Sequence, residues 1–149
     1  MTRRLDQCFH AGLFEECTTI LRVMSGMHPG DAQISDDLVY MLGNVDRHGE
    51  ALAEAIRFHK QNPKSLLGTE QLARYYFMRK LYTKVPPILQ AVPVKSRTLN
   101  VSLMLGRSLE EIGLLKKSLD VWEARLKLFP SDPSAKRHIE RLKKKIAGG

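Results

Sequence analysis

Apolar residues recur along the chain at two spacings, one within a helix and one of about 34 residues. One column holds Leu38, Leu72 and Leu105, and another large side chain follows four residues after each, at Leu42, Tyr76 and Leu109. A further column holds Leu21, Leu89 and Trp122. Because side chains four residues apart share one face of a helix, the pattern predicts helices that are repeated as copies of one unit.

Prolines and small residues keep the longer of these two periods. Pro29 and Pro63 lie one such period apart, and Pro130 follows after two further periods. One slot of each copy holds a small side chain: Cys17, Ala51, Val85 and Ser118. Since proline stops a helix and small residues let two helices approach closely, each copy is predicted to be a pair of packed helices.

The copy at 99–132 shows the complete set of these features. It contains Leu105-Gly106, Leu109, Gly113, Ser118, Trp122 and Pro130. The period and these residue types resemble the tetratricopeptide repeat (TPR), a helix–turn–helix unit of about 34 residues. The resemblance implies an all-α solenoid over 1–132. Its four expected repeats are about 1–31, 32–65, 66–98 and 99–132, the first of them truncated because Met1 already lies inside its first helix.

The third copy departs from the pattern in its second helix. Lys84-Val85-Pro86-Pro87 opens that helix, and Pro93 follows soon after. Proline is tolerated in the first helical turn only, so the helix is predicted to start near Val85 and to end before Pro93. In addition, Phe58 and Arg125 occupy a slot that is normally small, which predicts loose or shifted packing there.

Residues 133–149 are predicted to form a capping helix, at about 134–146. Ser131-Asp132-Pro133-Ser134 is a stop followed by an N-cap signal, after which Ala135, Ile139, Leu142 and Ile146 share one face. The outward face would hold the basic residues Lys136, Arg137, Arg141, Lys143, Lys144 and Lys145. The formal net charge of the chain is +8, and residues 116–149 contribute +6 of it. This charge is typical of a solvated face, but it also fits nucleic acid, an anionic membrane or an acidic protein as a partner.

The register of the repeats predicts a concave groove for a protein or peptide partner. Tyr40, Arg74 and Arg107 occupy equivalent inward positions, and the neighbouring positions hold Phe77, Met78, Leu103 and Met104. Two guanidinium groups beside apolar side chains would suit an extended peptide with an acidic or aromatic residue. The alternative is that Phe77 and Met78 pack between repeats while the arginines are merely solvated. The chaperone-binding subclass has Lys and Asn at positions that here hold Asp36, Tyr40, Glu70 and Arg74, so that function is not expected.

A narrower resemblance concerns residues 91–98 and the repeat that follows. Val92-Pro93, three residues and Arg97-Thr98 resemble the N-terminal region of the seventh subunit of the anaphase-promoting complex, as do Ala11-Gly12-Leu13 and Val23-Met24-Ser25. This resemblance implies a non-catalytic scaffold in a ubiquitin ligase of the cell cycle. It also implies homodimerisation through the N-terminal repeats.

Composition and motifs exclude several other classes. With 43% hydrophobic and 27% charged residues, the chain is neither disordered nor a coiled-coil rod. No catalytic, metal-binding or cofactor-binding constellation occurs, so no enzyme and no cofactor is expected, and Cys8 and Cys17 are predicted to be buried thiols. No signal peptide and no membrane span are expected, which favours an intracellular protein of the cytoplasm or nucleus. Two alternatives stay open: a basic repeat protein in a ribonucleoprotein such as an organellar ribosome, and a peripheral membrane adaptor.

Overall fold

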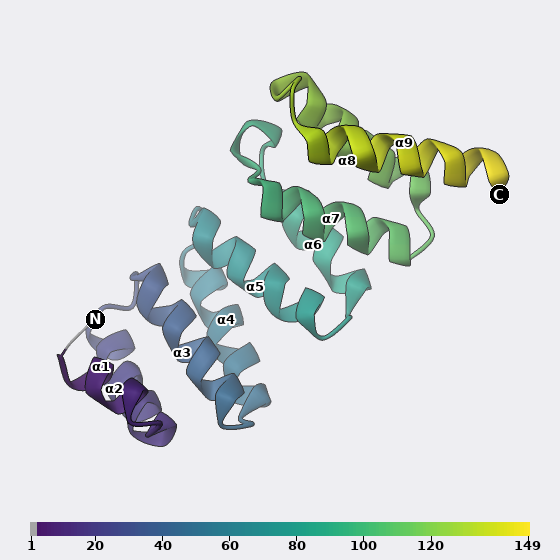
Figure 1. Cartoon of the computed structure of the whole chain (residues 1–149). Helices are drawn as coiled ribbons and strands as arrows, with labels where there is room; N and C mark the ends of the chain where they lie inside the picture. The colour runs from purple at the N-terminus through teal and green to yellow at the C-terminus, as the bar shows by residue number, and fades with distance from the viewer. Residues whose placement is uncertain (1–2) are drawn as a thin grey trace. The chain divides into compact units, whose positions relative to one another are not determined.

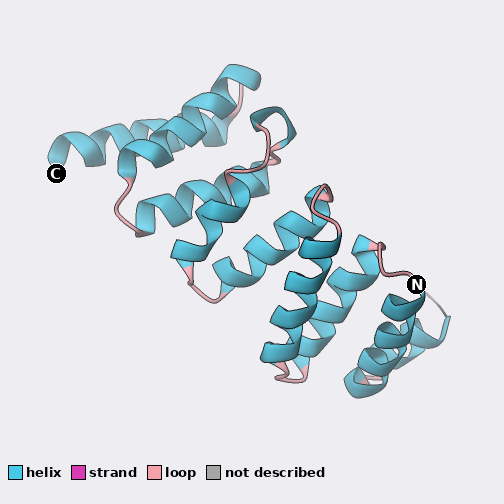
Figure 2. Cartoon of the chain, turned by 180° about the vertical axis from the view of Figure 1, so that it is seen from behind, coloured by secondary structure: helices cyan, strands magenta, loops and turns pink. Residues whose placement is uncertain are grey.

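The computed structural model describes residues 3–149, and these residues form helices joined by short loops (Figures 1 and 2). No strand occurs among them, so the all-α prediction is confirmed. The α-helices are α1 (Arg3–His10), α2 (Phe14–Met27), α3 (Ala32–Asn44), α4 (His48–Gln61), α5 (Leu66–Met78), α6 (Val85–Leu89), α7 (Leu99–Glu111), α8 (Leu115–Leu128) and α9 (Pro133–Gly148). Two short 3-10 helices, η1 (Tyr82–Lys84) and η2 (Val94–Ser96), flank α6. The predicted helical position of Met1 lies outside the described residues.

The chain divides into two compact units, the first ending at Tyr75 and the second beginning at Tyr76. In the first unit α1 packs on α2, α2 on α3 and α3 on α4. In the second unit α6 packs on α7, α7 on α8 and α8 on α9. Helix α9, which covers most of the predicted cap at 133–149, therefore belongs to the second unit.

The two helices of every pair are joined by the same left-handed turn. One residue with positive φ ends the first helix of each pair, at Gly12, Asp46, Lys80 and Gly113. The residue after it donates its backbone N–H to a carbonyl of the helix five residues back: Leu13 to Cys8, Arg47 to Leu42, Leu81 to Tyr76 and Leu114 to Leu109, all at 2.8–2.9 Å. This is the Schellman hydrogen bond that closes a helix and reverses the chain. The backbone thus repeats even where glycine is absent.

The first helices of the pairs from α3 onward, together with α9, also share the way in which they begin. A side-chain oxygen just before each helix accepts backbone N–H groups of the first turn, at Asp31, Ser65, Thr98 and Asp132. Each of these residues follows the previous one by one repeat period. Such caps satisfy N–H groups that have no partner inside the helix and contribute about 1 kcal/mol each.

Large aromatic side chains pack against glycines where two helices meet. Trp122 of α8 is fully buried, as its position in the repeat predicts, and a Cβ atom added to Gly106 of α7 would lie 2.7 Å from its indole nitrogen. Ser118 strengthens the same contact, because its hydroxyl donates to the carbonyl of Gly106 at 2.8 Å. In the first unit, the fully buried ring of Phe58 lies over Gly68 in the same way.

Of the two alternatives predicted at Phe58 and Arg125, loose or shifted packing, the loose one is wrong. The missing side chain of Gly68 makes room for the phenyl ring, so Phe58 is accommodated without a gap. Arg125 is largely buried, where it pairs with Asp132 and lies over the ring of Phe129 at 4.6 Å. Both large side chains thus have specific partners that the repeat pattern does not include.

Helix α6 starts at Val85 and ends at Leu89, as the prolines predict. The segment after it is held by Arg97, whose guanidinium group donates to the carbonyls of Val92 (3.0 Å) and Gln90 (3.4 Å). Arg97 therefore fixes the irregular loop that replaces the rest of a regular second helix.

We expect Gly106→Ala to lower the free energy of unfolding by about 1–3 kcal/mol, because the new methyl group must displace a fully buried indole. The matched control is Gly26→Ala in α2, where an added Cβ would meet no neighbouring atom. That substitution should leave stability unchanged or raise it by up to about 1 kcal/mol, the difference in helix propensity. Urea denaturation followed by circular dichroism measures both; equal effects of the two changes would refute the packing described for Trp122.

Candidate protein-binding surface

In the first unit, Tyr40 and Arg74 have different surroundings. Tyr40 projects from α3 and is 60% exposed. Arg74, on α5, lies 3.5 Å from the carboxylate of Asp36 on α3 and 3.9 Å from that of Glu70 one turn back. Burial raises the pKa of Asp36, and the nearby Arg74 opposes that rise. Arg74 therefore links α3 to α5, and its charge is already balanced by two carboxylates.

In the second unit, the predicted groove residues fall into two groups. Arg107 pairs with Glu111 on the same helix, and Met78, at the end of α5, is 74% exposed. Phe77 is half-buried, with its ring edge-on to Tyr82 at 5.8 Å. These three side chains are at least partly accessible.

The placement of Met104 in the groove is wrong, whereas that of Leu103 stays a prediction. Met104 is only 6% exposed, so it belongs to the core. Leu103 is half-buried and packs against the cluster formed by Trp122, Ala135 and Leu142. Both lie on α7, and the repeat register alone does not show which of its faces the following helices cover.

The seven predicted groove residues are divided between the two units. Tyr40 and Arg74 lie in the first, and the other five lie in the second. The common surface that the register predicts for Tyr40, Arg74 and Arg107 stays a prediction.

The basic helix α9 is anchored to α7 through a buried carboxylate. Glu110, on α7, accepts two hydrogen bonds from Arg141 (2.6 and 2.8 Å) and one from Lys145 (3.0 Å). The hydrogen bond from Arg141 is the main cause that lowers the pKa of Glu110 to about 2; burial opposes it, and Lys145 adds to the lowering. Arg141 and Lys145 both stay exposed while they hold this anchor. The sequence signal for it is the four-residue spacing of Arg141 and Lys145, which places both on one face of α9.

An aromatic stack lies beside this anchor. The imidazole ring of His138 lies flat on the indole of Trp122, with 4.1 Å between centroids and 7° between planes. Ala135 and Leu142 of α9 are fully buried in the same cluster. Burial lowers the pKa of His138, and the neighbouring Arg141 acts in the same direction. Helix α9 thus covers the aromatic core of the second unit.

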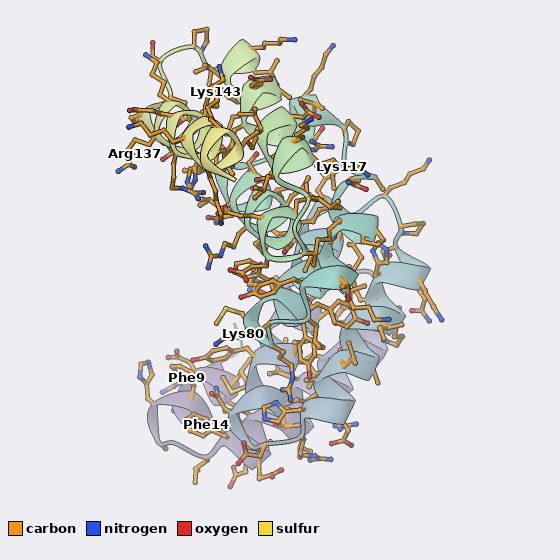
Figure 3. The ribbon with its side chains drawn as sticks, turned by 90° about the vertical axis from the view of Figure 1, so that its right-hand side faces the viewer. Phe9, Phe14, Lys80, Lys117, Arg137 and Lys143 are labelled. Carbon is orange, nitrogen blue, oxygen red and sulfur yellow. The ribbon has the colours of Figure 1, made fainter. Side chains whose placement is uncertain are left out.

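The other basic residues of α9 are more accessible. Lys143 lies 3.9 Å from Glu123, and Lys144 lies 3.0 Å from Glu140. Lys136 and Arg137 have no ion pair among residues 3–149. Figure 3 shows Arg137 and Lys143 on α9 and Lys117 on α8, at the surface of the second unit. The sequence has 16 Lys and Arg against 6 Asp and Glu over 76–149, but 8 against 10 over 1–75.

The described part of the chain shows no group of three or more His, Cys, Asp or Glu side chains that could hold a metal ion. Cys8 and Cys17 are buried, and burial raises the pKa of both thiols.

Phe9 and Phe14 pack edge-on at the α1–α2 hairpin (Figure 3). None of the helices in residues 3–149 has the length and apolar composition that crossing a bilayer requires.

Solved structures similar to this chain are TPR-type helical repeats. MamA of Desulfovibrio magneticus RS-1, from its residue 41 onward, superimposes with a TM-score of 0.72 at 17% identity, over 96% of this chain and 81% of that chain. For MamA of strain AMB-1 the TM-score is 0.70 at 18% identity, over 97% and 79%. For TTC0263, a TPR protein of Thermus thermophilus, it is 0.61 at 17% identity, over 97% and 80%.

No family model and no curated protein matches the sequence. The structural similarities establish the TPR-type fold that the sequence predicted. The narrower resemblance to a subunit of the anaphase-promoting complex rests on sequence alone.

We expect Glu110→Gln to lower the free energy of unfolding at neutral pH by about 2–3 kcal/mol, because Arg141 and Lys145 lose their buried partner. The carboxylate has a folded pKa of about 2 against an ordinary value of 4.5. Its contribution is therefore complete above about pH 4.5 and is lost as the pH falls toward 2. Thermal melts at neutral pH and from about pH 5 to about pH 3 should show a smaller acid dependence in the variant.

The control for this experiment is Glu140→Gln, which removes an exposed carboxylate that pairs with Lys144 on α9 itself. It should change stability by less than about 1 kcal/mol. If both substitutions cost the same, Glu110 does not anchor α9.

Proposed function

We propose that this chain is a non-catalytic scaffold that binds protein partners along the exposed faces of its first helices. One observation carries the proposal: in a fold whose core is already complete, large side chains of the first helices stay exposed. Tyr40 on α3 and Met78 at the end of α5 are the main examples. Exposed aromatic and thioether side chains provide much contact area, and such residues are enriched in interfaces.

The charges on these helices support an aromatic or apolar anchor in the partner. Arg74 is already neutralised by Asp36 and Glu70, and Arg107 pairs with Glu111. An acidic residue of the partner would have to displace these carboxylates. We therefore assign the main recognition to Tyr40 and Met78, and not to the two guanidinium groups.

A place in an anaphase-promoting-complex-like ubiquitin ligase, and homodimerisation through the N-terminal repeats, are finer proposals that rest on residues 91–98 and the N-terminal segment. The structure offers Arg97 a local role, because it bonds to the carbonyls of Val92 and Gln90. Any protein with this loop would need such a contact. The motif alone therefore supports a shared loop, and the ligase assignment needs evidence from partners.

A ribonucleoprotein role is favoured by one observation, the excess of basic residues in the second unit. Single-stranded RNA recognition also needs free aromatic faces for base stacking. The side chains of Trp122 and His138 are stacked on each other, and the indole is buried. The exposed lysines of α9 therefore support phosphate contact at most. A membrane adaptor would have to expose Ala135 and Leu142, which are buried against the rest of the second unit.

We expect the double variant Tyr40→Ser with Met78→Ser to lose most partner capture, because it removes the two exposed anchors on the first helices. Its melting temperature should stay within a few degrees of the original, since exposed side chains contribute little to stability. The measurement is affinity capture of partners followed by mass spectrometry, with thermal melts of the same preparations.

The matched control is Val23→Ser with Met27→Ser, which removes two exposed apolar side chains from the second helix α2. This variant should capture the same partners as the original chain. Equal losses in both variants would show that capture depends on non-specific apolar contact. Capture that survives in the Tyr40 and Met78 variant but is abolished by ribonuclease would favour the ribonucleoprotein role.

A further inference from the structure

The second helix of the third pair is much shorter than its counterparts. Helices α2, α4 and α8 each have 14 residues, whereas α6 has 5 and is preceded by the 3-residue η1. The chain that follows α6 turns away and continues as η2, which lies against α8. Part of the surface of α8 that a regular second helix would border is therefore left open.

A hollow of about 400 Å³ lies at this place, between η2 and the C-terminal half of α8. Its apolar lining comes from Val94, Ala124 and Leu128, and Leu128 is 42% exposed. Phe129, directly after α8, is also exposed. We call this hollow the α8 groove. The volume of the hollow falls in the range of ligand sites and suits one or two bulky side chains.

The rim of the α8 groove carries cations without acidic partners. Lys95 and Lys127 line the hollow and have no ion pair among residues 3–149. Of the two acids on the rim, Glu123 faces Lys143. Asp120 alone opposes these cations, in a unit whose sequence has ten more basic than acidic residues.

We propose that the α8 groove binds an acidic amphipathic segment of a partner protein. Its apolar side chains would enter the hollow between Val94 and Leu128. Its carboxylates would pair with Lys95 and Lys127, which have no ion pair in the described part of the chain. The apolar lining favours this occupant over nucleic acid, which needs cations but gains little from aliphatic side chains.

This inference goes beyond the proposed scaffold function, because the groove lies on a second helix. Tyr40 and Met78, which carry the proposed function, take no part in it. The two surfaces can therefore succeed or fail independently, and the same variants can be examined for both.

The test uses a short fluorescein-labelled peptide with Leu and Phe four positions apart among glutamates, titrated with the full chain and followed by fluorescence anisotropy. Lys95→Glu with Lys127→Glu should weaken binding about tenfold or more. The matched control, Lys116→Glu with Lys117→Glu, makes the same change of charge at exposed positions near the other end of α8. It should weaken binding by less than about threefold. Leu128→Ser should also weaken binding while leaving the melting temperature nearly unchanged.

Three results would overturn the proposal. Equal losses of affinity in the two double variants would show that the peptide responds to the net charge of the chain and not to the groove. Equally tight binding of a peptide with lysines in place of the glutamates would exclude recognition of carboxylates. Finally, a single-stranded oligonucleotide could bind more tightly than the acidic peptide and lose affinity when Lys95 and Lys127 are replaced by Glu. That result would make the groove a phosphate site. In every case, partner capture through Tyr40 and Met78 is measured separately on the same variants. If the acidic peptide fails to bind, that measurement still decides the proposed function.

Discussion

The left-handed turn inside each helical pair is the constraint on which the rest of the structure depends. It recurs at Gly12, Asp46, Lys80 and Gly113, closed each time by the same backbone hydrogen bond. Because the turn reverses the chain within a few residues, the two helices that it joins inside one unit pack against each other: α1 with α2, α3 with α4 and α7 with α8. That packing is close enough for the indole of Trp122 to lie on the backbone of Gly106. The first helices then keep one exposed face, where the proposed partner surface lies.

Much of this fold follows from the sequence, because the residues that keep the long repeat period are the ones that pack between helices. The burial of Trp122 and the start of α6 at Val85 are confirmed for that reason. The left-handed turns at Asp46 and Lys80 cannot be recognised in the sequence, because neither position holds glycine. Backbone hydrogen bonds set their shape. The buried position of Met104 does not follow from the repeat register, because burial depends on the neighbouring elements as well.

Charge has different roles in different parts of the molecule. Arg141 and Lys145 stay exposed and anchor α9 through Glu110. The sequence does not show this role, because Glu110 is distant from both of them along the chain. The remaining cations of the second unit include Lys95 and Lys127, which have no such partner among residues 3–149 and are available to an acidic ligand. The basic composition therefore combines a structural contribution with a binding one, and α9 belongs mainly to the first.

Hydrogen–deuterium exchange of the chain, alone and in complex with a captured protein partner, tests the central claim most directly. The account predicts slower exchange of backbone amides in the first helices α3, α5 and α7, because partner contacts there would suppress local opening. Exchange in α9 should stay unchanged, since that helix is already held by Glu110 and the Trp122 cluster. Slower exchange confined to α9 would contradict the account and make the basic helix the functional surface.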